Sequence, residues 1–155
     1  MPKEPKKLLF FEDDYETLRH LREYLEQDLG WQVEVTAEAS ILERLASEAF
    51  DLILIDIMVR PESLDVEGHK VQNVHFDEVS WLRTGLAFLE HLRSGDFVVM
   101  PGQGTSPDVP VIVLSAVAHY SVEHELPPSS ATIDYVEKPF RVSDLVARIK
   151  RLTQE

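Results

Sequence analysis

The sequence predicts an α/β fold in which helices cover both faces of a five-stranded parallel sheet. Apolar runs short enough to be strands alternate along the chain with segments of helical periodicity, which is typical of such a sheet. In addition, the run "DLILIDI" at 51–57 shows no alternation of polar and apolar residues. A strand that is apolar on both sides is expected inside a parallel sheet, because helices bury both of its faces.

The predicted elements follow one another in a regular order. The short apolar runs are the predicted strands, at 6–11, 31–37, 51–57, 110–118 and 133–140. The segments with apolar residues at helical spacing are the predicted helices, at 14–30, 40–50, 84–95 and 143–152. Pro127 and Pro128 would truncate any helix before the last strand.

Two segments do not fit this alternation. Residues 60–84 are too many for an ordinary connection of about two to six residues, so we expect an insertion after the third strand. It begins beside a strand end and would form a lid or a docking surface, with Phe76 and Trp81 as anchors. Residues 95–109 are rich in Gly, Pro and Ser and predict a loop. The whole chain, 1–155, is expected to be a single domain.

Composition excludes several classes of protein. A net charge of −13, from 28 acidic and 15 basic residues, disfavours direct binding to nucleic acid and favours a cationic partner or a metal. No apolar run approaches the roughly 20 residues that span a bilayer, and the N-terminus lacks the pattern of a signal peptide. The chain has no cysteine, which suits a reducing, cytoplasmic environment.

Polar residues stand at the carboxyl ends of the predicted strands. The first strand ends in Glu12, Asp13 and Asp14, the third ends at Asp56, the fourth at Ser115, and the last runs into Lys138. Parallel strands place these ends along one edge of the sheet, where ligands bind in such folds. Asp14 is expected to be an ordinary acid at the start of a helix.

The chemistry of these residues suits a phosphoryl group. Crowded carboxylates repel one another and therefore take up protons or recruit a hard cation such as Mg²⁺. With the ammonium of Lys138 and the hydroxyl of Ser115 added, the negative charge of a phosphoryl group could be neutralised. A carboxylate held beside the metal could then act as the nucleophile that receives it.

Four motifs, "LLFFEDD", "DLILIDIMV", "VIVLSA" and "DYVEKPF", resemble in their order and spacing the CheY-like receiver domain of two-component response regulators. The resemblance covers nearly all of the chain outside the two long segments. It implies a flavodoxin-like, three-layer fold with strand order 2-1-3-4-5.

The resemblance also implies roles for individual residues. Asp56 resembles the phospho-acceptor. Glu12, Asp13 and Asp56, with the backbone carbonyl of Met58, resemble the ligands of Mg²⁺. Ser115 and Lys138 resemble the catalytic hydroxyl and ammonium, Ser115 and Tyr135 the pair of switch residues, and the Lys138–Pro139 peptide is expected to be cis.

The chain departs from the family pattern after the acceptor. Met58 is followed by Val59 and Arg60 instead of a short turn into the next helix, and Gly85 comes only after the insertion. This leaves the site chemistry in place but puts the usual partner contacts in doubt. Met58 and Val117, two positions beyond the acceptor and the switch hydroxyl, are apolar, so we expect a long-lived phosphorylated state.

The function implied is a phosphorylation-dependent signalling switch, not an enzyme, that receives a phosphoryl group on Asp56 from a histidine kinase or phosphotransfer protein. Its output would pass to a downstream protein or output domain, with a phosphorylation-dependent dimer as one form and no nucleic acid or membrane bound directly. A stand-alone regulator and a fragment of a longer one both fit. A phosphate-independent scaffold remains an alternative, and an aspartyl-phosphate hydrolase is a weaker one, because Met58 stands where the second acid of that class is expected.

Overall fold

The computed structural model describes residues 5–13, 19–65, 67–115 and 132–153. Its main sheet is parallel and has the order β2 (Gln32–Val35), β1 (Lys7–Phe11), β3 (Leu52–Asp56), β6 (Val111–Ser115) and β7 (Ile133–Glu137). This is the flavodoxin-like order 2-1-3-4-5 that the sequence predicts, with β6 and β7 as its fourth and fifth strands. The predicted fold is therefore confirmed.

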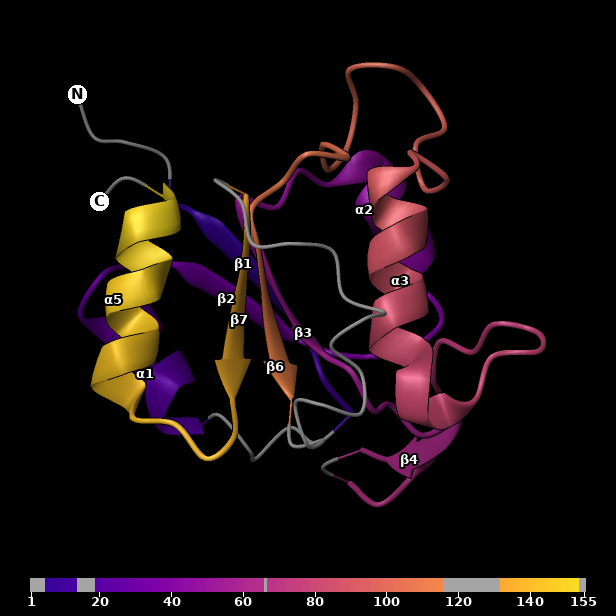
Figure 1. Cartoon of the computed structure of the whole chain (residues 1–155), viewed down its shortest axis with the longest axis horizontal. Helices are drawn as coiled ribbons and strands as arrows, with labels where there is room; N and C mark the ends of the chain where they lie inside the picture. Colours follow the sequence, from indigo (N-terminus) through magenta and orange to yellow (C-terminus); the bar gives the residue numbers. More distant parts are fainter. Residues whose placement is uncertain (1–4, 14–18, 66, 116–131, 154–155) are drawn as a thin grey trace.

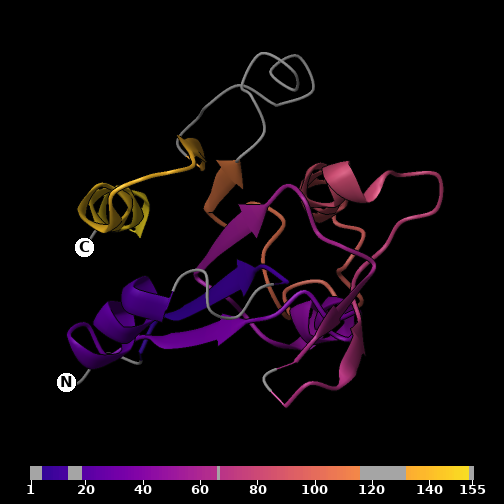
Figure 2. The same ribbon diagram turned by 90° about the horizontal axis from the view of Figure 1, so that it is seen from below.

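Helices cover both faces of the sheet (Figure 1). Helices α1 (Arg19–Gln27) and α5 (Val142–Thr153) lie on one face, and α2 (Ile41–Ser47) and α3 (Thr84–Arg93) lie on the other. Figure 2, from below, shows the same two pairs on either side of the sheet. The predicted start of the first helix, the end of the predicted fourth strand with Val117, and the Pro127–Pro128 pair lie outside the described residues.

The strand sequences build two separate cores because successive side chains point to opposite faces. In β1, Leu8 and Phe10 pack with the apolar faces of α1 and α5, whereas Leu9 and Phe11 pack with α2 and α3. Strands β3 and β6 alternate in the same way, and the side chains of β3 are all buried. The central strands are thus held rigidly up to their carboxyl ends, where the polar residues begin.

The insertion at 60–84 contains ordered elements. Strands β4 (Glu62–Leu64) and β5 (Lys70–Gln72) form an antiparallel hairpin, and a short 3₁₀ helix, η1 (Trp81–Arg83), leads into α3. The hairpin is attached to the segment before α2: Val74 N–H donates to Ala37 O at 2.7 Å. The expected anchors differ, since Phe76 stacks on His91 with ring centroids 4.6 Å apart, whereas Trp81 is 40% exposed.

The loop at 95–109 docks against the end of α2. The Thr105 hydroxyl donates to Glu48 O at 2.7 Å and accepts from the Phe50 N–H at 3.1 Å. Gly104 has a φ of +76°, and an added Cβ there would lie 2.4 Å from Leu45 O. This turn therefore needs glycine both for its backbone conformation and for space.

None of the helices in the described part of the chain has the length and apolar character needed to cross a bilayer.

Candidate functional site

Asp56 is the last residue of β3, and its position is fixed by the neighbouring strands. It pairs with Leu114 of β6, and the next residue donates its N–H to Leu114 O. The side chain of Asp56 turns back onto its own loop, where its Oδ1 accepts a hydrogen bond from Met58 N–H at 3.2 Å. Asp56 is only 8% exposed, so its carboxylate needs partners that offset its burial.

Lys138 supplies one of these partners. It follows β7, its peptide bond to Pro139 is cis as the resemblance implies, and its N–H donates to Ser115 O at 2.8 Å. From this position its Nζ donates to Asp56 Oδ2 at 3.1 Å and lies 3.6 Å from Glu12 Oε2. One ammonium thus contacts carboxylates that follow β1 and end β3.

Glu12 and Asp13 extend the acidic group from β1. Phe11 pairs with Ile55, so the next residue of each strand, Glu12 and Asp56, lies at the same level of the sheet edge. Burial raises the pKa of Glu12 to about 9, with further contributions from its hydrogen bond with Asp56 and from the negative charge of that residue. Protons or a cation must therefore relieve the charge at this edge.

The ammonium of Lys138 responds to these acids. Burial alone lowers its pKa, but the charges of Asp56 and Glu12 outweigh that effect, and the pKa of Lys138 is raised. Lys138 therefore stays protonated at neutral pH. It can accompany negative charge at Asp56 in any state of the site.

Asp13 has a cationic partner that the sequence did not predict. Arg60, at the start of the insertion, donates both its backbone N–H, at 3.1 Å, and its Nε, at 3.0 Å, to Asp13 Oδ2. Burial raises the pKa of Asp13, but hydrogen bonds from Glu12 and Arg60 outweigh this effect and lower it. The one sequence signal was Arg60 itself, which follows Val59 where a short turn into the next helix was expected. No periodicity relates Arg60 to Asp13.

Helix α3 packs directly on the backbone at the end of β3. Gly85 N–H donates to Ile57 O at 2.8 Å, and a Cβ on Gly85 would lie 2.2 Å from Asp56 O. Thr84 is fully buried, and its hydroxyl donates to Val59 O at 3.3 Å. The chain therefore returns from the insertion to the same loop that carries Met58.

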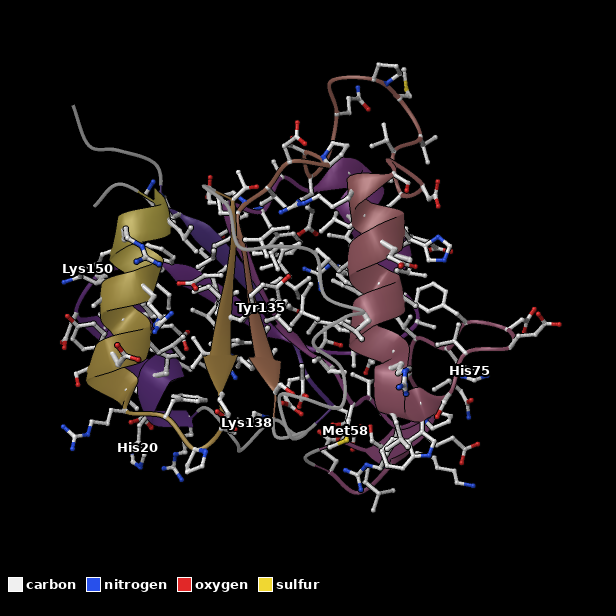
Figure 3. All side chains as sticks on the ribbon, viewed as in Figure 1. His20, Met58, His75, Tyr135, Lys138 and Lys150 are labelled. Atoms are coloured by element: carbon white, nitrogen blue, oxygen red, sulfur yellow. The ribbon has the colours of Figure 1, made fainter. Side chains whose placement is uncertain are left out.

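The remaining predicted residues lie on the strands around this edge. Ser115 ends β6, pairs with Glu137 and is partly exposed. Tyr135 pairs with Val113, packs against the core beneath α2 and α3, and burial raises the pKa of its hydroxyl. Figure 3 shows Lys138 and Met58 near the lower edge of the sheet and Tyr135 higher on β7. Asp14 lies outside the described residues.

Three acidic side chains at this edge are the candidate ligands of Mg²⁺. Within the described ranges, no three acidic or histidine side chains form a ready-made metal cluster. The chemistry of the donors nevertheless suits a hard cation, because the buried carboxylates of Glu12, Asp13 and Asp56 lie at one edge of the sheet. The raised pKa of Glu12 shows that positive charge is favoured there. Arg60 and Lys138 already neutralise part of the negative charge that a divalent cation would balance.

Comparison with solved structures identifies the fold. The receiver domain of the Francisella response regulator 1452 matches with a TM-score of 0.62 and 22% identity, over 97% of this chain and 98% of that one. The receiver domain of the Pseudomonas aeruginosa PAO1 sensor histidine kinase PA1611 matches with a TM-score of 0.61 and 20% identity, over 98% of this chain and 100% of that one. The chain therefore has the fold of response regulator receiver domains. The resemblance that its motifs carry is confirmed at this level.

One curated protein is similar to the chain in sequence. The transcriptional regulatory protein CrdR of Helicobacter pylori is 30% identical over 148 residues, which are 94% of this chain and 54% of that protein. The chain thus spans about half the length of this curated relative. No family model matches the chain. The PA1611 receiver structure has a magnesium ion coordinated in its active site cleft.

Proposed function

We propose that this receiver domain is a phosphorylation-dependent signalling switch that accepts a phosphoryl group on Asp56 with Mg²⁺ as cofactor. The observation that carries the proposal is the contact of Lys138 Nζ with Asp56 Oδ2 at 3.1 Å, next to Glu12 at 3.6 Å. Residues that follow three different strands thereby meet around one carboxylate. A buried acid with a lysine at this edge is the arrangement that an aspartyl nucleophile needs.

The phosphoryl donor is a histidine kinase or a phosphotransfer protein, as the fold family implies. An oxygen of Asp56 attacks phosphorus and forms the new P–O bond, while the P–N bond to the donor histidine breaks. The electron pair of that bond remains on the imidazole nitrogen, which then takes up a proton. The flexible stem of Lys138 would let its ammonium move from Asp56 Oδ2 to the phosphoryl oxygens.

Mg²⁺ would be held by Glu12, Asp13, Asp56 and the backbone carbonyl of Met58, and it would supply positive charge to the carboxylates and to the transferred group. Lys138 would contact a phosphoryl oxygen, and the hydroxyl of Ser115 would donate to another. These contacts would pull the side chains of Ser115 and Lys138 inward, toward Asp56. Tyr135, which packs against the core beneath α2 and α3, would change position with Ser115.

The signal would be a shift of a pre-existing equilibrium at the surface near β7 and α5. That surface would contact the downstream protein, an output domain or a second receiver in a phosphorylation-dependent dimer. The phosphoryl group adds negative charge and strong acceptor oxygens to Asp56, so the signal begins as a change in electrostatics.

The test is incubation of the protein with a small phosphodonor, such as acetyl phosphate, and Mg²⁺, followed by intact mass measurement. We expect one added phosphoryl group on the wild-type chain and none on Asp56→Asn. Absence of the adduct on the wild type would favour the phosphate-independent scaffold. Sustained turnover of added phosphate esters would instead favour the hydrolase.

A further inference from the structure

Arg60 links the insertion to the acidic residues of the site. Its backbone N–H and its Nε both donate to a single oxygen, Asp13 Oδ2, at 3.1 and 3.0 Å. The side chain of Asp13 is only 7% exposed, whereas that of Arg60 is 60% exposed. The guanidinium thus lies at the mouth of the site and neutralises a carboxylate that is buried within it.

The insertion holds Arg60 in this position. Asn73, which is 5% exposed, donates from Nδ2 to Arg60 O at 2.9 Å and to Ser63 Oγ at 3.0 Å. Its backbone N–H donates to Pro61 O at 2.9 Å. The residue that follows β5 therefore fixes the backbone on both sides of the Arg60–Pro61 peptide.

The same part of the insertion is attached to the body of the domain. Asn73 forms an isolated bridge with Glu38, and Ala39 N–H donates to Gln72 O at 3.0 Å. The next residue, Val74, is 1% exposed and belongs to the core beneath α2 and α3. Arg60 is therefore positioned by a chain of contacts that reaches the core, and not by its own side chain alone.

A cation at Asp13 must meet the charge of this guanidinium. A divalent ion that binds an oxygen of Asp13 either displaces Nε from Oδ2 or remains within a few ångströms of the positive charge. Both routes cost free energy, because like charges repel and the pair that already exists must be broken or shared.

We propose that Arg60 is an insertion-borne counter-ion of Asp13 that competes with the divalent cation and so sets the affinity of the site for Mg²⁺. This inference rests on the proposed function, because it takes Asp13 as a metal ligand. The insertion thereby acts on the metal step of the switch. In this role Arg60 is a positioning and affinity-setting residue and takes no part in bond making.

The test is titration with MgCl₂ alone, at constant ionic strength and without phosphodonor, followed by calorimetry or by backbone amide NMR shifts. Removal of one positive charge near the ion in Arg60→Gln is expected to lower the Kd for Mg²⁺ by about three- to tenfold. Arg60→Lys retains the charge and is expected to stay within about twofold of the wild type.

Arg44→Gln is the matched control. It also removes a carboxylate-paired arginine, since Arg44 bonds Glu34 at 2.6 Å and Glu48 at 3.1 Å. It lies, however, beside Lys7 and Gln32, at the opposite edge of the sheet. We expect its Mg²⁺ affinity to equal that of the wild type, and a gain equal to that of Arg60→Gln would contradict a local effect of Arg60.

The outcomes separate the two proposals. An equal or weaker Mg²⁺ affinity in Arg60→Gln, with clear binding to the wild type that Asp13→Asn abolishes, overturns the role of Arg60 and leaves the proposed function standing. Binding to neither the wild type nor Arg60→Gln overturns both. Binding that is detectable only in Arg60→Gln supports the inference in its strongest form.

Discussion

Lys138 joins two acids that are far apart in the sequence. Its Nζ contacts Asp56 and lies near Glu12, and its own pKa is raised because these charges outweigh its burial. Without this lysine, the buried carboxylates would lose a compensating positive charge, which is costly. At the scale of single residues, charge balance is therefore the property that makes this strand edge a site.

Met58 offers a test of how long the phosphorylated state lasts. Its N–H is bonded to Asp56, while its thioether side chain cannot orient an attacking water by strong hydrogen bonding. Met58→Asn adds an amide that can do so. We expect the lifetime of the aspartyl phosphate to fall roughly tenfold, equivalent to about 1.4 kcal/mol of barrier, when phosphate loss is followed with Mg²⁺ present.

Met100→Asn is the control for this change, because Met100 is 55% exposed in the loop at 95–109. Its phosphate lifetime should equal that of the wild type. A rapid loss of phosphate from the wild-type protein itself would count against the expected protection by Met58.

Helix α3 and the insertion show how an element can fix a site without contributing ligands. The insertion ends at η1, where Val59 N–H donates to Trp81 O at 3.2 Å, and α3 then begins against the loop after β3. The hairpin and α3 thus hold the loop that carries Met58 and Arg60 from two sides. The insertion therefore supports that loop, and its expected role as a lid or a docking surface stays a prediction.

Gly85 packs tightly against the backbone at the end of β3. A methyl group in Gly85→Ala would lie 2.2 Å from Asp56 O and 2.7 Å from Ile57 Cα, so α3 or the end of β3 must shift. Overpacking of this kind costs about 1–3 kcal/mol, which urea unfolding should detect as a lower midpoint. The same variant should take up phosphate more slowly from a small donor.

A neighbouring substitution controls for the general effect of a change in this helix. Ala87→Ser alters a buried residue of α3 that is not in the loop contact described for Gly85. We expect it to lower stability without slowing phosphorylation. If Gly85→Ala unfolds at the same urea concentration as the wild type, the close packing of α3 on Asp56 is not a constraint.

The sequence predicted the sheet well because the physical signal was strong. Runs such as 51–57 are apolar on both faces, and Leu8, Leu9, Phe10 and Phe11 divide between the two cores as a period of two requires. Glu12, Asp56 and Lys138 were also within reach of sequence reasoning, because the carboxyl ends of parallel strands share one edge.

Other features were beyond sequence reasoning. The β4–β5 hairpin consists of very short strands, and the bond of Arg60 to Asp13 joins residues with no common periodicity. Trp81 was expected to be an anchor, but its side chain is exposed, and Val59 contacts only its backbone oxygen. Contacts between loops depend on the final packing and leave little trace in a pattern of apolar residues.

At the scale of the whole molecule, the acidic edge should make stability depend on divalent cations. Mg²⁺ that binds the folded state alone stabilises it by about 1.4 kcal/mol at a concentration near ten times its Kd. For a domain of this size we expect the melting temperature to rise by about 3–6 °C in differential scanning calorimetry. Potassium chloride at equal ionic strength should have a smaller effect.

Asp13→Asn tests the origin of that stabilisation. The variant removes a carboxylate that is buried at the site, so the gain from Mg²⁺ should be lost while the fold remains. An unchanged response to Mg²⁺ would place the cation elsewhere on this strongly acidic chain, whose net charge is −13.

The most direct measurement is a crystal structure of the protein with Mg²⁺ and beryllofluoride, which mimics an aspartyl phosphate. We expect a beryllofluoride group bonded through beryllium to an oxygen of Asp56, with Lys138 and Ser115 in contact with its fluorine atoms. The cation should be held by Glu12, Asp13, Asp56 and the carbonyl of Met58. An unmodified Asp56 at saturating beryllofluoride, or a cation bound away from this edge, would contradict it.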